Sequence, residues 1–455
     1  MDNQTALEKR VFTVLFSAMA ISMTGTGFGP LMGIYARELG AAGFMLGVFA
    51  SSFPAARTLS QPFVGHLSDR GYKKFFIAAG ILIFVLVSFG YKLAGSPMLL
   101  VLMRFIHGIA TAMVMPVAIA YIGEMTPKGR EGAYTSIFNI SFMIGWGVGP
   151  MLAGFLWEPE DLLRGVRSFL EFSSPLVPHL VGKLTMLVAT VEESTQGWGI
   201  HTVFTGMALM TSVAFALIVF FLPSDRRFMA SRNGNGENQP SPAFPLRILL
   251  KDNTALGLLV WSLVHSIGRG ASLFFISVFA KEVANVSAFG TGVIISLYTL
   301  VPIFFYGSIG RLADRMSRVK LIVLGTIGRA ALYSLLPLTV TFMPLLGLCI
   351  LIGVIEAFSA IASTALSVDL GRQYGMGSVQ GAFQTAQSLG MLAAGPVNGI
   401  IFQAFSINLV FFNGSFMELV SIVSLLIFIK MSGEARWQRR SEKVAASSES
   451  TGDEG

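Results

Sequence analysis

The sequence is short of charge and of cysteine. Only 13% of its 455 residues are Asp, Glu, Lys or Arg, against about 25% in a typical water-soluble domain. Hydrophobic residues make up 53% of the chain, so most of the molecular surface must face lipid rather than water. The single cysteine, Cys349, can form no disulfide within the chain, which excludes a disulfide-stabilised scaffold. The composition predicts an all-α polytopic membrane protein.

The excess of basic residues does not predict a nucleic-acid partner. The formal net charge is +7, but the Lys and Arg residues lie in short segments between apolar runs and form no continuous basic patch. The sequence contains no phosphate-binding loop, metal-spaced Cys/His set or nucleophile elbow. We therefore expect no enzyme activity, no cofactor, no metal and no nucleic-acid partner.

Twelve apolar segments are long enough to cross a bilayer. A spanning helix needs about 20 mostly apolar residues, and every backbone polar group in hydrocarbon must be paired within its own segment. By this criterion we expect membrane-spanning helices at 11–36, 41–65, 75–95, 98–121, 134–156, 200–222, 253–278, 287–310, 319–341, 343–366, 378–405 and 407–430.

The Lys and Arg residues predict the orientation of these helices. With the N-terminus in the cytoplasm, 22 of the 32 basic residues fall in segments on the cytoplasmic side. Six fall in segments on the opposite side, namely Arg37, Lys92, Arg164, Arg167, Lys183 and Lys281. Because basic residues favour cytoplasmic loops, we expect both termini inside and the protein in the cytoplasmic membrane.

The predicted spans fall into two halves, with three further segments. The N-terminal half, 1–222, contains a long external insertion, 157–199, whose amphipathic and apolar pieces predict either helices at the membrane surface or an external cap. The polar stretch 223–252 predicts a flexible cytoplasmic linker. The C-terminal half is 253–431, and the polar composition of the tail, 432–455, predicts disorder.

Short motifs of the first half recur in the second half at nearly constant spacing. Three pairs lie 244 to 246 residues apart: IYAREL at 34–39 with VFAKEV at 278–283, GHLSDR at 65–70 with GRLADR at 310–315, and Gly149-Pro150 with Gly395-Pro396. The nearly constant spacing predicts two related six-helix bundles. Transporters are often built from such repeats, with the substrate site between them.

The duplicated loop sequence resembles a motif of the major facilitator superfamily, G-x-x-x-D-[RK]-x-G-[RK]-[RK], which lies between helices 2 and 3. The first copy matches at Gly65, Asp69, Arg70, Lys73 and Lys74. The second copy keeps Gly310, Asp314, Arg315 and Arg318. Tyr72 stands where the family pattern has its second glycine.

Three helix sequences also resemble motifs of this superfamily. Arg104 and Gly108 match the R-x-x-x-G pattern of helix 4, and GTGFGPLMG at 25–33 resembles a helix-1 motif. The helix-5 sequence is similar to the motif of the drug/proton antiporter branch, which contains exporters, at Gly145, Gly149, Pro150 and Gly154. The resemblance implies a twelve-helix transporter for a small-molecule substrate and for protons, and we expect it to be a monomer.

The resemblance implies a gating role for the two loop motifs. Asp69 and Asp314 lie at predicted cytoplasmic helix ends beside arginines, where charge-assisted hydrogen bonds can hold one conformation. We expect an inner gate there, with Arg130 as the partner of Asp69. The alternative is a solvated loop that is basic because it faces the cytoplasm.

Polar and charged side chains inside the spans are the candidates for the substrate and proton pathway, because such groups are costly in a membrane. The candidates are Arg104, His107, His265, Arg269, Glu356, Gln384 and Gln387. We expect Arg104 and Arg269 to face each other from opposite halves. Glu356 is the one carboxylate expected in the cavity, so we interpret it as the proton-coupling group, with a structural pair to an arginine as the alternative.

Two further ionisable groups are predicted about halfway across the bilayer. Arg329 and Glu418 lie on spans that are peripheral in the resembled fold. A rise of about 1.5 Å per residue puts them at similar depth. We therefore expect them to form a structural ion pair shielded from lipid.

Three functions remain open. The helix-1 and helix-5 motifs favour proton-coupled efflux of amphipathic or drug-like compounds, and the 22 Met and 38 Phe residues suit loose apolar recognition. The basic side chains of the pathway favour a carrier of organic anions, because Arg binds carboxylate or phosphate in a bidentate way. The third interpretation is a membrane sensor that transports nothing.

Overall fold

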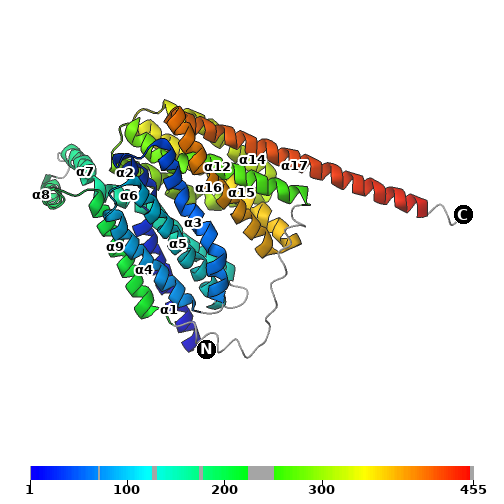
Figure 1. Ribbon diagram of the computed structural model, residues 1–455, viewed down its shortest axis with the longest axis horizontal. Helices are drawn as coiled ribbons and strands as arrows, with labels where there is room; N and C mark the ends of the chain where they lie inside the picture. The colour runs from blue at the N-terminus through cyan, green and yellow to red at the C-terminus, as the bar shows by residue number, and fades with distance from the viewer. Residues whose placement is uncertain (1, 70–71, 126–130, 174–177, 224–250, 451–455) are drawn as a thin grey trace.

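The computed structural model describes residues 2–69, 72–125, 131–173, 178–223 and 251–450. Within these ranges every regular element is a helix, which confirms the predicted all-α class. Figure 1 shows the long helices gathered into two bundles, with the N-terminal half in blue to green and the C-terminal half in green to red.

Six helical segments correspond to the predicted spans of the N-terminal half. The first span is divided into three elements. They are α1 (Asp2–Thr26), the 3-10 turn η1 (Gly29–Leu31) and α2 (Met32–Glu38). The break coincides with the glycine-rich stretch 25–30, which weakens a helix. The other five are α3 (Gly43–Asp69), α4 (Lys73–Lys92), α5 (Pro97–Met125), α6 (Glu131–Trp157) and α9 (Ile200–Ala216) with its π-helical end η2 (Leu217–Phe221).

The C-terminal half repeats this order of long helices. Its elements are α12 (Asn253–Glu282), α13 (Ala288–Arg315), α14 (Arg318–Leu335) with η3 (Leu336–Leu338), α15 (Phe342–Tyr374), α16 (Met376–Ala404) and α17 (Ile407–Ser450). Each of the twelve predicted spans therefore coincides with a helical segment. The largest boundary differences are at the start of α1 and the end of α17, which extend well beyond the predicted spans.

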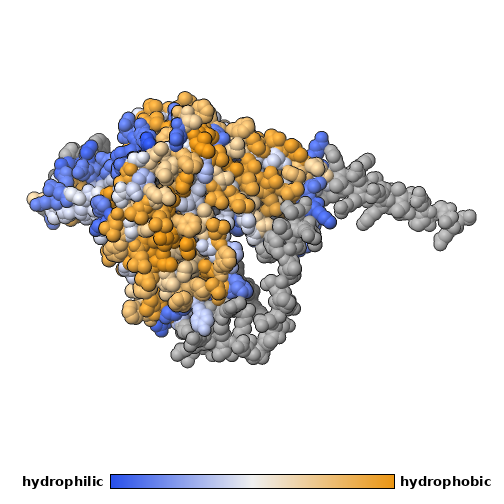
Figure 2. Space-filling view, in the orientation of Figure 1, coloured by the Kyte–Doolittle hydropathy of each residue, from blue (hydrophilic) through white to orange (hydrophobic). Residues whose placement is uncertain are grey.

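Ten of the described helical segments are long and apolar enough to cross a membrane. The segments α3 and α16 fall outside this set, and they carry polar side chains such as Arg57 on α3 and Gln384 and Gln387 on α16. Figure 2 shows hydrophobic residues over the sides of the bundles and hydrophilic residues toward the ends of the helices. The molecule is built as an integral membrane protein.

Residues 157–199 form a helical hairpin beside the bundle (Figure 1). The two helices are α7 (Pro159–Ser173) and α8 (Pro178–Ser194). They pack through Leu163, Leu170 and Val188, and Arg167 forms an ion pair with Glu192. The location of this hairpin at the membrane surface stays a prediction.

The last helix runs on into the segment for which the sequence predicts disorder. The last helix, α17, continues to Ser450 and projects away from the bundle (Figure 1). Residues 432–450 contain no proline and are rich in Glu, Lys, Arg and Ala, which are good helix formers. The helix of the last span can therefore continue into the tail. Residues 224–250 of the predicted linker and residues 451–455 lie outside the described residues.

The two halves pack together at one end of the molecule. We call it the hairpin end, because α7 and α8 lie there, and the opposite end, with Pro223 and Lys251, the linker end. Between the halves, α3 packs against α16 and α6 packs against α13. Figure 1 shows the bundles converging at the hairpin end and diverging toward the linker end.

Close backbone contacts make this closure possible. A Cβ atom on Gly47 of α3 would overlap the carbonyl oxygen of Gly395 on α16, and one on Gly292 of α13 would overlap the carbonyl oxygen of Pro150 on α6. Small residues let membrane helices approach this closely. The duplicated Gly-Pro motif thus lies at two equivalent crossings between the halves.

We expect Gly47→Val to open the hairpin end. The added side chain overlaps α16, and overpacking of this kind costs about 1–3 kcal/mol. The measurement is the rate at which a membrane-impermeant maleimide labels Phe274→Cys from the hairpin side, in a Cys349→Ala background. Gly307→Val is the matched control, because a Cβ atom at Gly307 meets open space. Equal labelling of the two valine variants would contradict the assigned crossing.

Candidate functional site

The C-terminal half contains a buried cluster of charged groups near its centre. Arg329 of α14 forms an ion pair with Glu418 of α17, and both side chains are 0% exposed. His265 of α12 completes this part of the cluster, because its Nδ1 lies 2.8 Å from Oε2 of Glu418 and 3.1 Å from Nη2 of Arg329. The indole of Trp261, one helical turn before His265, stacks on the imidazole ring at 4.4 Å.

Glu356 of α15 joins the same cluster from the other side. Its Oε1 lies 2.9 Å from Nε of Arg269 and 3.3 Å from Nη1 of Arg329, and the hydroxyl of Tyr298 donates to its Oε2. The exposed fraction of the side chains falls from 43% at Arg269 to 12% at Glu356 and 0% at Arg329. The cluster is therefore accessible at the Arg269 end and sealed at the Arg329 end.

The charges of this cluster balance within the C-terminal half. Two guanidinium groups, Arg269 and Arg329, face two carboxylates, Glu356 and Glu418. Five helices contribute side chains, namely α12, α13, α14, α15 and α17. Among the residues that the structure describes, no group of His, Cys, Asp and Glu side chains could hold a metal ion.

This arrangement differs from the one we expected for Arg269, and Glu356 forms the arginine pairs that we gave as the alternative to a coupling role. Arg329 contacts Glu418, as their similar depth in the bilayer predicted. Arg329 also contacts Glu356, which was not predicted. Arg269 points to Glu356 in its own half and does not form a facing pair with Arg104. A charge in the membrane interior gains most from a counter-charge at contact distance, and helical depth alone does not reveal which neighbour supplies it.

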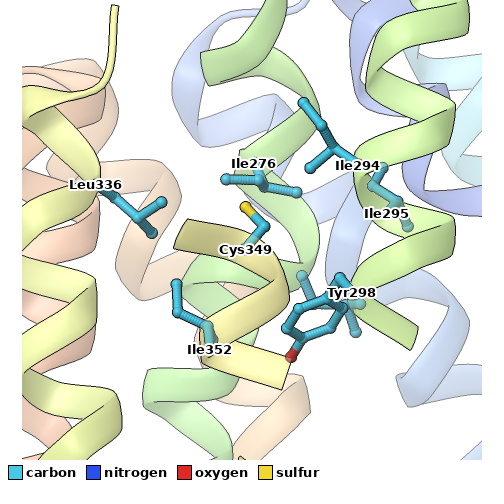
Figure 3. Close-up of a pocket in the computed structure, with 8 residues that line it drawn as sticks. Ile276, Ile294, Ile295, Tyr298, Leu336, Cys349 and Ile352 are labelled. Atoms are coloured by element: carbon cyan, nitrogen blue, oxygen red, sulfur yellow. The ribbon is translucent and has the colours of Figure 1, made fainter. Parts of the chain in front are cut away.

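An apolar pocket lies next to the cluster between α12, α13 and α15 (Figure 3). Its walls include Leu273, Ile294, Cys349 and Ile352. Figure 3 shows the Tyr298 ring at the edge of this pocket, with its hydroxyl directed toward α15. Tyr298 therefore joins an apolar surface to the Glu356 carboxylate, and no sequence motif singled it out.

The N-terminal half holds Arg104 and His107 on α5 in an aromatic environment. The Arg104 guanidinium lies 4.9 Å from the centre of the Phe53 ring and 5.6 Å from that of Phe49. The imidazole of His107 is 2% exposed, and its Nδ1 lies 3.3 Å from the hydroxyl of Tyr91. Both predicted pathway residues are thus buried side chains of one helix face.

The two glutamines of the predicted pathway belong to neither group. Gln384 is exposed and Gln387 is half-buried on α16. Neither takes part in the described contacts of the C-terminal cluster. Their role in a substrate pathway stays a prediction.

The predicted inner-gate motifs are described only in part. The side chains of Asp69, Arg70, Arg130 and Asp314 lie outside the described residues, so the predicted contact between Asp69 and Arg130 is not visible. Lys74 donates to the carbonyl oxygens of Val219 and Leu222 at the end of the same half. Lys73 is buried at the start of α4.

In the second copy of the motif, Arg318 forms an ion pair with Asp369 of α15 and donates to the carbonyl oxygen of Ala365, while Arg315 is exposed at the end of α13. Among the described residues, a Cβ atom on either of the glycines that begin the two motifs, Gly65 and Gly310, would meet nothing within 4 Å. This openness agrees with the divergence of the halves at the linker end.

Tyr72, which stands at the second glycine position of the motif, adopts a backbone conformation that favours glycine. Its φ angle is 69°, in the left-handed region, directly before α4 begins at Lys73. For a residue with a side chain this conformation costs roughly 1–2 kcal/mol. The turn therefore has a left-handed residue at this position although the glycine is absent.

The helix-5 motif packs α6 between two neighbours. A Cβ atom on Gly145 would lie 2.6 Å from Cβ of Met23, and one on Gly149 would lie 2.7 Å from Cα of Gly27, both on the first span. Gly154 and Pro150 instead face α13 of the other half. The motif thus fits one helix tightly against its own half and against the partner half.

Sequence reasoning missed two ion pairs that join the halves at the hairpin end. Nε of Arg37 on α2 lies 2.5 Å from Oε1 of Glu282 on α12. Nζ of Lys281 lies 3.0 Å from Oε1 of Glu158, whose Oε2 also accepts a hydrogen bond from the backbone N–H of Ala288. The signal was present in the repeat, because Arg37-Glu38 and Lys281-Glu282 are its equivalent positions.

Comparison with known proteins agrees with this architecture. The profile of a family described as the Major Facilitator Superfamily matches residues 14–158, 194–394 and 262–451. A relative from Methanocaldococcus jannaschii, described as an uncharacterised MFS-type transporter, is 27% identical over 92% of this chain and 98% of its own length. The quinolone resistance protein NorA of Staphylococcus aureus is 29% identical over 38% of this chain and 45% of its own length.

Solved structures share the fold at low identity. The nucleoside transporter NupG superposes with a TM-score of 0.69 at 13% identity, over 93% of this chain and 99% of that protein. The human organic anion transporter MFSD10 superposes with a TM-score of 0.57 at 15% identity, over 92% and 99% of the two chains. Because the family profile matches most of the sequence and the fold agrees, the chain belongs to the Major Facilitator Superfamily.

Proposed function

We propose that this protein is a proton-coupled exporter of amphipathic compounds that works by alternating access. The observation that carries the proposal is the position of Glu356, which links an accessible arginine, Arg269, to a sealed one, Arg329. A relative described as a quinolone resistance protein and the glycine-rich packing of α6 support the direction of transport.

Alternating access is supported by where the halves touch. The contacts between them join α3 to α16 and α6 to α13 toward the hairpin end, and the motif glycines Gly65 and Gly310 have free space beside them. With both termini in the cytoplasm, as the Lys and Arg distribution favours, this conformation opens to the inside. The outward-open state requires these hairpin-end contacts to break and the linker ends to close.

Proton coupling is supported by the gradient of exposure through the cluster. Water at the Arg269 end can deliver a proton to Glu356, whose neutral form no longer holds Arg269. Glu418 has no such access and keeps Arg329 and His265 in position. In this scheme Glu356 is the coupling carboxylate, Glu418 is structural, and the transporter works as a monomer in the cytoplasmic membrane.

We expect Glu356→Gln to lose gradient-driven transport and to keep exchange. A neutral amide cannot gain or release the coupling proton, while substrate exchange down its own gradient needs no proton. The measurement is accumulation of a fluorescent amphipathic dye in proteoliposomes with a pH gradient, next to counterflow without one. Glu193→Gln on α8 is the control. Wild-type accumulation by Glu356→Gln would remove the assignment.

We expect Arg329 and Glu418 to be needed together for stability. Removing one partner of a buried ion pair costs about 3–5 kcal/mol, because the other charge is left without compensation. Arg329→Met and Glu418→Leu should each lower the thermal unfolding temperature in detergent. The double variant should recover part of the loss, since Arg269 and Glu356 still balance. A double variant with the summed loss of the two single variants would argue against the pair.

We expect charge reversal at Glu282 to weaken the hairpin-end closure. The half-exposed pair with Arg37 contributes about 0.2–1 kcal/mol, so Glu282→Arg should raise maleimide labelling of Phe274→Cys from that side by roughly two- to fivefold. The double variant Arg37→Glu with Glu282→Arg restores opposite charges and should return labelling toward the wild-type rate. If the double variant labels as fast as Glu282→Arg, the pair does not hold the halves.

A further inference from the structure

The two halves differ in whether their buried arginines have carboxylate partners in the same half. The C-terminal half balances Arg269 and Arg329 with two glutamates. The N-terminal half contains Arg57 and Arg104 within its spans, yet its six predicted spans contain no Asp or Glu at all. Glu158 at the hairpin end is already paired with Lys281. A buried cation without a counter-charge is costly in a membrane, and the six predicted spans of the N-terminal half supply no carboxylate for Arg104.

Arg104 is held in a position to receive that partner. Its side chain is 8% exposed, and its Nε has no hydrogen-bond partner in the structure as described. Its guanidinium lies over the Phe49 and Phe53 rings. A Cβ atom on Gly29 of η1 would lie 2.6 Å from Nη2 of Arg104. A residue with a side chain at this position would therefore overlap the guanidinium.

Arg104 borders two small cavities that meet at its side chain. The first lies between the halves and is also lined by Gly29, Trp146 and Phe274. The second lies within the N-terminal half, where Arg57, His107 and Thr111 add polar groups to the walls. Trp146 lines both cavities. A bound group beside Arg104 would therefore meet donors on one side and aromatic faces on the other.

The cavity between the halves also adjoins an apolar pocket. Leu273 of α12 lines this cavity together with Arg104, and it lines the pocket of Figure 3 together with Ile294, Ile295 and Ile352. Leu273 thus connects the surroundings of Arg104 to the apolar walls of the C-terminal half. Each space has room for only about one water molecule in this conformation, so a molecule with a charged head at Arg104 and an apolar body extends past Leu273 only when the halves separate here.

We infer that the substrate class of the transporter is amphipathic organic anions, bound through a carboxylate or similar group by Arg104. The guanidinium offers two parallel donors to a carboxylate, and the bound anion supplies the negative charge that the N-terminal half lacks. The inference rests on the proposed transport function for its meaning, but the binding that it requires can be measured without transport.

The test is direct binding of three matched probes to the full protein in lipid nanodiscs by calorimetry. The probes are 2-naphthoate, the neutral 2-naphthamide and the cationic 2-naphthylmethylammonium, which share one ring system and differ in head group. We expect the naphthoate to bind at least about tenfold more tightly than the other two, because bidentate charge-assisted bonds form only with the carboxylate. Equal binding of the three, or preference for the cation, overturns the inference.

Single-residue variants test whether Arg104 is responsible for the preference for naphthoate. Arg104→Gln should lose about tenfold or more in naphthoate affinity with little change for the amide, and Arg104→Lys should keep part of it as a point charge. Arg311→Gln, an exposed arginine at the end of α13, is the control. Naphthoate binding by folded Arg104→Gln at the wild-type level overturns the assignment; if that variant fails to fold, the comparison of head groups on wild type decides.

The same measurement separates this inference from the proposed function. Glu356→Gln should bind naphthoate like wild type while losing its gradient-driven uptake into proteoliposomes. Naphthoate binding without any gradient-driven transport by the wild type leaves the substrate class standing and removes the transport proposal. If the wild type transports a neutral or cationic dye but does not bind naphthoate, the transport proposal stands and the substrate class is wrong.

Discussion

Charge inside a membrane must be compensated within the protein, and this constraint organises the C-terminal half. Arg329 reaches Glu356 and Glu418 at once, so α14, α15 and α17 are tied together through one guanidinium. His265 and Arg269, one turn apart on α12, extend the network toward the accessible side. The pairing holds five helices in register around a polar centre that lipid could not solvate.

The two halves repeat in sequence but have diverged in chemistry. The repeat preserves the elements that the halves use against each other, namely the Gly-Pro crossings of α6 and α16 and the charged pairs at positions 37–38 and 281–282. The interior is not repeated. One half balances its own charges, and the predicted spans of the other contain no carboxylate for Arg104, which divides the molecule into a candidate coupling half and a candidate recognition half.

Much of the architecture could be predicted from the sequence because hydrophobicity and repetition are local signals. All twelve predicted spans coincide with helical segments, and helices were expected in 157–199 from its amphipathic and apolar pieces. The site was predicted less completely. Helical depth indicated that Arg329 and Glu418 could meet, but it did not predict that Arg329 also contacts Glu356, that Arg269 turns away from Arg104, or that Tyr298 binds the same carboxylate.

The sequence by itself determined the membrane class, the helical segments, the two related halves and the residues that carry charge in the bilayer. These follow from the cost of placing polar groups in lipid, which acts on each segment separately. Only the tertiary structure decided which charges meet, which side chain stays accessible and which end of the molecule is closed. Those properties depend on contacts between different helices, such as Tyr298 with Glu356, 58 residues apart, and Arg37 with Glu282, 245 residues apart. A shift of one residue around a helix moves a side chain by about 100°.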